Sequence, residues 1–193
     1  MSFRLWIPPG YDPSRRWPAI LFLHGAGERG DDNEKQLTVG LGPHLDALAP
    51  PAIVVFPQCP LGSSWVSQMQ RAIDALDAAR RDHAIDDDSI SLTGISLGGA
   101  GAWALAAAYP ERWSAVAPVC GWMEPIRPLP DVPYRIFHGD ADPVIDVEQS
   151  RRMAAQLGAR AEYTEFAGVT HNAWDPAYRD TDLVDWLVRQ RRL

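Results

Sequence analysis

Residues 89–108 read SISLTGISLGGAGAWALAAA, and this stretch decides the fold. It opens with a short β-branched and aliphatic run and closes with an alanine-rich run typical of a buried helix. The two are joined by Gly94-Ile95-Ser96-Leu97-Gly98, a G-x-S-x-G sequence. Such a strand-to-helix turn is so tight that side chains two positions before or after the serine would collide with the neighbouring strand and helix, and glycines avoid this. The pattern predicts that Ser96 projects its hydroxyl at the carboxyl end of a strand, where it can act as a nucleophile.

A serine hydroxyl is a weak nucleophile at neutral pH, so it needs a histidine base and an acid that orients the histidine. His171 follows the apolar run at 161–166, and Asp142 follows the run at 134–137. Both are expected on loops at the same sheet edge as Ser96, in the chain order Ser, Asp, His that this arrangement requires. Asp140 is an alternative acid, but its place close to the strand end suits a turn-forming carboxylate, so Asp142 is preferred.

The third requirement is an oxyanion hole, which combines the amide after the nucleophile with one from the loop after an early strand. Leu97 supplies the first amide. The second is expected from Leu23-His24-Gly25-Ala26-Gly27, whose glycines let the backbone turn its N–H groups toward the site. Ala26 is the predicted donor and Gly27 the alternative. An ordinary strand-ending turn is the other interpretation of this loop.

Short apolar runs alternate with helical patterns along the chain, which indicates an α/β fold with a mostly parallel sheet flanked by helices on both faces. The expected strands span residues 19–23, 52–56, 89–93, 114–119, 134–137 and 161–166, with an edge strand at 4–7. Helices are expected near 69–83, 99–108, 147–157 and 181–191. The length and the lack of a linker predict a single domain over 1–193, minimal and without a lid.

Composition argues against several classes of function. The net charge is −7 and the charged residues are interspersed, so no nucleic-acid partner is expected. Cys59 and Cys120 are the only cysteines and lack metal or redox spacing, so we expect reduced thiols, no metal and no cofactor. No apolar run approaches the roughly 18 residues of a membrane span, and the first residues lack a signal-peptide core. A cytoplasmic protein without a membrane partner is therefore predicted.

Candidate substrate-binding residues come from two groups. Three of the eight tryptophans, Trp65, Trp122 and Trp174, fall on loops expected at the catalytic edge, where they would line an aromatic pocket for an acyl or aryl group. Core packing explains each of them equally well. Glu28 and Arg29 open a charged run at 28–35, which is either the rim of the pocket or an ordinary solvated loop.

Together these segments resemble a known family. Its marks are LFLHGAGERG at 21–30, PQCP at 57–60, GISLGG at 94–99, HGDAD at 138–142 and HNAW at 171–174, which span nearly the whole chain. They are similar to the α/β-hydrolase superfamily, in the phospholipase/carboxylesterase and "predicted peptidase" group related to dienelactone hydrolases, acyl-protein thioesterases and feruloyl esterases. The resemblance implies the α/β-hydrolase fold and a cofactor-independent serine carboxylesterase for short acyl or aryl esters. Many members carry an N-terminal extension, whereas this chain begins close to its first strand.

Other interpretations use the same residues. Peptide or amide hydrolysis and thioester cleavage need the same triad, but the chain has no propeller domain to select peptides, so cleavage of a small ester is preferred. A ligand-binding protein that has kept the pocket and lost turnover is a different class, and the intact Ser, Asp and His set argues against it. A homodimer through the last helix or an edge strand is left open.

Overall fold

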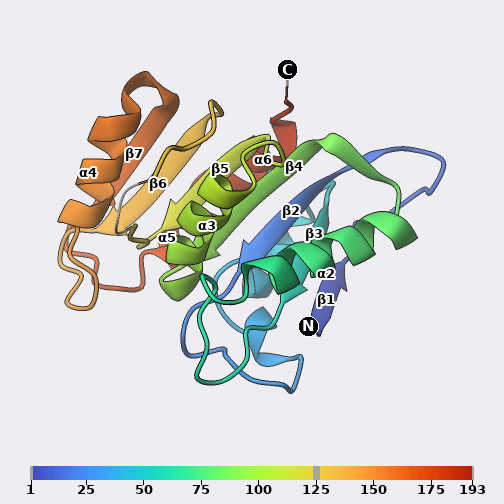
Figure 1. The fold of residues 1–193 in the computed structure, drawn as a ribbon, viewed down its shortest axis with the longest axis horizontal. Coiled ribbons are helices and arrows are strands. Elements are labelled where there is room, and N and C mark those ends of the chain that lie inside the picture. The colour runs from blue at the N-terminus through green and yellow to red at the C-terminus, as the bar shows by residue number, and fades with distance from the viewer. Residues whose placement is uncertain (1, 124–126, 193) are drawn as a thin grey trace.

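The computed structural model describes residues 2–123 and 127–192, and its centre is a seven-stranded sheet (Figure 1). The strands are β1 (Phe3–Trp6), β2 (Trp17–Leu23), β3 (Ile53–Pro57), β4 (Ile85–Ile95), β5 (Ala115–Val119), β6 (Tyr134–Gly139) and β7 (Ala161–Phe166). They lie in the order β1-β3-β2-β4-β5-β6-β7. β1 runs antiparallel to β3, and every other pair of neighbours is parallel, so the predicted mostly parallel sheet is confirmed.

Helices cover both faces of the sheet, as the alternation of elements predicts. One face carries α2 (Met69–Asp82), α3 (Leu97–Ala108) and α4 (Glu148–Leu157). The other carries α1 (Leu45–Leu48), α5 (Trp174–Arg179) and α6 (Leu183–Arg189). Short 3-10 turns lie at Lys35–Leu37, Gly42–His44 and Gly158–Arg160. Among the helices described, none combines the length and the apolar character that crossing a membrane requires.

The core is divided into two layers by the alternation of side chains along the strands. Leu21 and Leu23 of β2 point to the side of α2 and α3, where Trp103 is fully buried. Ile20 and Phe22 point to the opposite side, toward α5 and α6. Because β2 is buried on both faces, its sequence is a continuous apolar run rather than an alternating one.

The turn between β4 and α3 is held in a strained conformation. Ser96 has a φ of 52°, in the left-handed region that non-glycine residues rarely adopt. Its N–H donates to the Val119 carbonyl at 2.9 Å, and its own carbonyl accepts from the Ala100 N–H at 3.0 Å. These backbone hydrogen bonds on both sides hold the serine at the carboxyl edge of the sheet.

Glycine is required at position 98, two residues after Ser96, because the backbones of β2 and α3 approach closely there. A Cβ atom on Gly98 would lie 1.9 Å from the Leu23 carbonyl oxygen, which no small side-chain movement relieves. We expect Gly98→Ala to lower the free energy of unfolding by about 3 kcal/mol or more, because β2 and α3 must separate. Urea unfolding measures this. Gly27→Ala is the matched control, since open space surrounds Gly27 and its unfolding free energy should change by less than about 1 kcal/mol.

Element boundaries lie within two residues of the sequence expectation except at the start of β4. β4 begins at Ile85 rather than at residue 89, so the strand includes three aspartates, Asp86 to Asp88. Aspartate is a poor strand former, but Arg191 and Arg192, which are distant in sequence, pair with Asp86 and Asp88. The nearby Arg80 pairs with Asp87. The short helices α1 and α5 were not expected. Residues 1, 124–126 and 193 of the expected domain lie outside the described part of the chain.

Candidate active site

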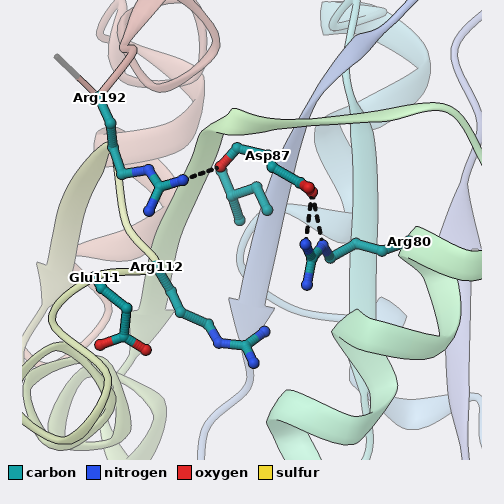
Figure 2. A pocket seen from close by; sticks show the side chains of 6 residues that line it. Arg80, Asp87, Glu111, Arg112 and Arg192 are labelled. Atoms are coloured by element: carbon teal, nitrogen blue, oxygen red, sulfur yellow. Dashed lines mark hydrogen bonds and ion pairs between the residues drawn. The ribbon is translucent and has the colours of Figure 1, made fainter.

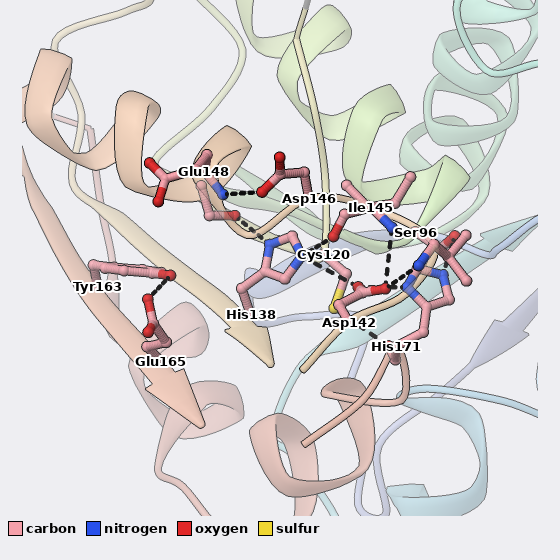
Figure 3. Close-up of polar contacts among 12 residues, drawn as sticks. Ser96, Cys120, His138, Asp142, Ile145, Asp146, Glu148, Tyr163, Glu165 and His171 are labelled. Carbon is pink, nitrogen blue, oxygen red and sulfur yellow. Dashed lines mark hydrogen bonds and ion pairs between the residues drawn. The ribbon is translucent and has the colours of Figure 1, made fainter. Parts of the chain in front are cut away.

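Three side chains from separate loops form one line of hydrogen bonds at the carboxyl edge of the sheet (Figure 3). Ser96 follows β4, Asp142 follows β6 and His171 follows β7. The Ser96 Oγ lies 2.8 Å from His171 Nε2, and His171 Nδ1 lies 2.7 Å from Asp142 Oδ2. Because parallel strands end at the same edge, residues up to 75 positions apart come into direct contact.

The Asp142 carboxylate is buried but well supplied with donors. Its side chain is 0% exposed, and its Oδ1 accepts from the amides of Val144 at 2.8 Å and Ile145 at 3.0 Å. Burial by itself would raise its pKa, but hydrogen bonds from His171 and from those amides outweigh burial and hold the pKa of Asp142 below its usual value. The carboxylate is therefore ionised at neutral pH and accepts a proton-bearing Nδ1 from His171. That tautomer leaves the His171 Nε2 lone pair facing the Ser96 hydroxyl.

The alternative acid, Asp140, takes a different position. Its Oδ1 accepts a hydrogen bond from the Gly168 amide at 2.6 Å, and the residue is exposed. This contact ties the loop after β6 to the loop after β7. Asp140 thus links two loops instead of bonding amides near it in sequence, as a turn-forming carboxylate would, and the structure brings Asp142 rather than Asp140 to His171.

The loop after β2 approaches the Ser96 turn from the other side and is fixed by two side chains. His24 is fully buried, and its Nδ1 donates to the Gly25 carbonyl at 2.7 Å, while its Nε2 accepts from the Cys59 amide at 2.9 Å. The Arg29 guanidinium donates to the Ala26 carbonyl at 2.9 Å and to the Ser63 carbonyl at 3.1 Å. Across from this loop, Leu97 is the first residue of α3, so its amide has no acceptor within its own helix.

The buried His24 side chain makes the stability of the protein depend on pH. Burial lowers the pKa of His24 to about 4, although the hydrogen bond to the Gly25 carbonyl acts in the opposite direction. In the unfolded chain the side chain takes up a proton near its reference pKa of about 6.5. The folded state does not take up this proton until the pH is near 4. His24 therefore contributes fully to the free energy of unfolding above about pH 6.5, and this contribution is lost as the pH falls toward 4.

The expected loss from His24 is about 3 kcal/mol between pH 7 and pH 4. Urea unfolding over this pH range measures it, with His24→Gln as the comparison because glutamine does not titrate. The glutamine variant should be less stable at pH 7 and should show a shallower decline with acid. Parallel declines for the two proteins would mean that His24 is not the titrating group.

Two hollows flank the Ser96 turn and divide the predicted substrate-binding residues between them. The first, of about 260 Å³, is lined by Gly25, Ala26, Gly27, Glu28, Ile95, Ser96, Val144, His171 and Trp174. The second, of about 190 Å³, includes Trp65, Leu97 and Trp122. Trp65 is itself fully buried, and its indole N–H donates to the His24 carbonyl at 2.8 Å, so it also supports the β2 loop. Trp174 packs edge-on against His171, with ring centroids 5.2 Å apart.

Glu28 lines the Ser96 hollow. This is the pocket-rim position that the sequence left open beside that of an ordinary solvated loop. Its carboxylate lies over Gly25, with Oε2 3.0 Å from where a Cβ atom of that residue would stand. Burial raises the pKa of Glu28, and the backbone amides of Glu28 and Gly25 oppose this rise. The acidic group is thus a polar feature in a lining that is otherwise mostly apolar.

A third hollow, of about 240 Å³, lies at the opposite edge of the sheet, near the beginning of β4 (Figure 2). Arg80, Arg112 and Arg192 line it together with Asp87 and Glu111. Each of these arginines is already paired with an acceptor. Arg80 forms a salt bridge with Asp87, and Arg112 forms one with Asp77 at 2.6 Å. Arg192 donates to the Asp87 carbonyl and to the Asp88 carboxylate. These pairs join α2, the start of β4 and the end of the chain.

Among the described residues, one group of three side chains has ligand atoms close enough to hold a metal ion. It consists of Cys120, Asp142 and His171, whose atoms lie within 4.8 Å of one another. Burial raises the pKa of Cys120 to about 12, so its thiol is protonated at neutral pH. Asp142 and His171 are bonded to each other. The group is held together by its own hydrogen bonds.

The sequence alone does not single out His138, which is named above only as part of the HGDAD segment at 138–142. In the structure His138 is 0% exposed and its Nε2 lies 3.2 Å from Asp142 Oδ2. The available signal was the alternation in β6, since Tyr134, Ile136 and His138 share one face and the first two are core residues. A histidine on the buried face of a strand needs polar partners, and these come from α4 and from the loop after β6.

No protein-family model matches the chain, but individual proteins resemble it in sequence and in structure. By sequence, the chain is 28% identical over 168 residues to "Probable feruloyl esterase C" of Aspergillus terreus, which covers 79% of this chain and 59% of that protein. By structure, it is similar to a thermostable esterase, with a TM-score of 0.83 and 32% identity over 98% of this chain and 59% of that one. The chain thus spans 59% of the length of each of these relatives.

A third likeness shows the fold alone. The feruloyl esterase module from Clostridium thermocellum, solved with sinapinate, matches with a TM-score of 0.75 and 13% identity over 99% of this chain and 84% of that one. Because the two structures superpose well at such low sequence identity, they share the order of the strands and the crossovers rather than the detailed sequence. The sheet, the position of Ser96 on its strand-to-helix turn and the likeness to the thermostable esterase together show that this chain has the α/β-hydrolase fold.

Proposed function

We propose that this chain is a serine carboxylesterase in which Ser96 is the nucleophile, His171 the general base and Asp142 the acid that orients it. The observation that carries the proposal is the unbroken line of short hydrogen bonds from Ser96 through His171 to a buried, ionised Asp142. A merely structural serine would not need a left-handed backbone that exposes its hydroxyl to a hollow.

In the proposed reaction the Ser96 oxygen attacks the ester carbonyl carbon while His171 Nε2 takes the hydroxyl proton. The amides of Leu97 and Ala26, or of Gly27 in place of Ala26, stabilise the oxyanion. His171 then gives its proton to the leaving alcohol, and an acyl-enzyme remains on Ser96. Water repeats the sequence, with His171 removing its proton, and the carboxylic acid leaves with the serine hydroxyl restored.

The proposed substrates are esters with a short acyl or an aryl group. The hollow at Ser96 has a volume of about 260 Å³, which is below the usual range for sites that enclose drug-sized molecules. Its lining is mostly apolar, with Trp174 beside His171 and Glu28 as the acidic group. The names of the relatives, which include feruloyl esterases, agree with an aryl acid in this role.

Hydrolysis of p-nitrophenyl acetate, butyrate, octanoate and palmitate by the purified chain tests this proposal, together with labelling by a serine-directed fluorophosphonate. We expect turnover of acetate and butyrate, little of palmitate, and a single label on Ser96 that abolishes activity. The matched butyryl anilide and butyryl thioester should react more slowly than the ester. A chain that neither turns over esters nor takes the label would contradict the assignment of a serine hydrolase.

A further inference from the structure

A second histidine stands behind the acid of the triad. His138, on β6, is 0% exposed, and its Nε2 lies 3.2 Å from Asp142 Oδ2, the same oxygen that contacts His171. Its Nε2 also lies 3.0 Å from the Ile145 carbonyl (Figure 3). Its Nδ1 lies 2.7 Å from Ser150 Oγ on α4. Every polar atom of this buried imidazole therefore has a partner.

The partners determine where the proton of His138 resides. A carbonyl oxygen and an ionised carboxylate can only accept hydrogen bonds, so Nε2 must carry a proton and donate it. The Ser150 hydroxyl can then donate to Nδ1 and complete a neutral imidazole. The result is a continuous chain in which Ser150, His138, Asp142, His171 and Ser96 follow one another.

The surroundings favour the neutral form of His138. Burial lowers the pKa of His138, against the opposing effects of the Ile145 carbonyl and the Asp142 carboxylate, and His171 adds to the lowering. Glu165 lies opposite His138 on β7, but its carboxylate is bonded to Arg151 at 2.6 and 2.8 Å and to the Tyr163 hydroxyl at 2.7 Å. Asp142 is therefore the carboxylate that His138 contacts.

We propose that His138 is a positioning residue for catalysis, which holds the Asp142 carboxylate in place by donating an N–H to the oxygen that His171 uses. This rests on the esterase function proposed above. The Val144 and Ile145 amides hold Oδ1, and the two imidazoles hold Oδ2, so the carboxylate is fixed from both sides. As a neutral donor, His138 leaves the negative charge on Asp142 available to the His171 imidazolium that forms during the reaction.

The test compares His138→Leu, which removes the donor, with His138→Gln, which restores it. The amide nitrogen of glutamine is the same number of bonds from Cα as Nε2 of histidine, and its two hydrogens suit the two acceptors. We expect His138→Leu to lower kcat for p-nitrophenyl butyrate by about 10- to 100-fold, with KM changed less than about twofold. Losses of this size are typical when a residue that hydrogen-bonds and orients a metal ligand is replaced, and His138 orients Asp142 in the same way. Glutamine should recover most of this loss.

The pH profile separates positioning from a general loss of structure. In His138→Leu the carboxylate has one donor fewer, so it holds the proton of the His171 imidazolium more tightly, and the acid limb of kcat/KM should move to higher pH. Rates are expressed per active site titrated with the fluorophosphonate, so that unfolded protein does not count. Ser150→Ala should reduce kcat to a smaller extent, whereas Ser91→Ala, which removes a similarly buried hydroxyl bonded to Ser114 and to the Leu187 carbonyl, should leave it unchanged.

The outcomes distinguish this proposal from the proposed function. If the wild-type chain hydrolyses esters and His138→Leu keeps both the wild-type kcat per titrated site and the acid limb, the positioning role is wrong and the esterase assignment stands. A leucine variant that loses activity without recovery by glutamine and without a shift of the acid limb also rejects the positioning role. A wild-type chain that neither turns over nor labels overturns both proposals.

Discussion

Ser96→Ala is expected to lower kcat/KM for p-nitrophenyl butyrate by on the order of 10⁵-fold or more, because no other group can form the acyl-enzyme. The fold should survive this change. Within the described part of the chain, the Ser96 hydroxyl makes one side-chain hydrogen bond, to His171 Nε2. The strained backbone of the turn is held by β5 and α3. The free energy of unfolding should therefore change by no more than about 1 kcal/mol.

This prediction is tested by steady-state kinetics, fluorophosphonate labelling and urea unfolding of the same preparations. Ser67→Ala is the matched control, because its hydroxyl is exposed and bonded only within the loop at 63–67. That control should keep full activity and full labelling. Residual activity of more than about a hundredth in Ser96→Ala would mean that ester hydrolysis occurs at another residue.

Asp142→Asn is expected to lower kcat by on the order of 10⁴-fold while KM changes little. The amide group has one donating and one accepting end, whereas the carboxylate accepts at both oxygens. If its NH₂ group takes the position of Oδ2, it faces the donors of His171 and His138; if it takes the position of Oδ1, it faces the amides of Val144 and Ile145. In the first case His171 avoids the clash of two donors by carrying its proton on Nε2. Nε2 can then no longer accept the serine proton.

Asp140→Asn is the control that separates the two acids that the sequence left as alternatives. Asparagine keeps an oxygen that can accept from the Gly168 amide, so this variant should retain activity within about twofold and nearly full stability. Kinetics of the two variants against the same ester at pH 8 give the answer directly. A large loss in Asp140→Asn with an active Asp142→Asn would transfer the role of the acid to Asp140.

Local sequence was sufficient for most of the architecture. The β7 strand was expected at 161–166 and spans Ala161–Phe166, and the turn at Ser96 joins a strand to a helix as its glycines require. These features depend on the period of apolar residues and on sterics within a few residues. The start of β4 was missed because two of its aspartates are paired with Arg191 and Arg192, which lie at the far end of the sequence.

The same distinction applies to the candidate site. The nucleophile turn and the order of Ser96, Asp142 and His171 follow from the sequence, because parallel strands deliver their following loops to one edge. The sequence could only rank Asp142 above Asp140, and it placed three tryptophans together that the structure divides between two hollows. Which carboxylate reaches His171 depends on how the loops after β6 and β7 pack against each other.

What the sequence by itself determined is therefore the fold class and the chemistry that the turn at Ser96 can support, since both arise from local backbone geometry and from hydrophobic periodicity. Only the tertiary structure decided that Asp142 is held between His171 and His138, and that Trp65 is buried beneath the β2 loop. The physical reason is that these contacts join residues from different strands and helices. Their distances depend on the packing of the whole sheet rather than on any short stretch of chain.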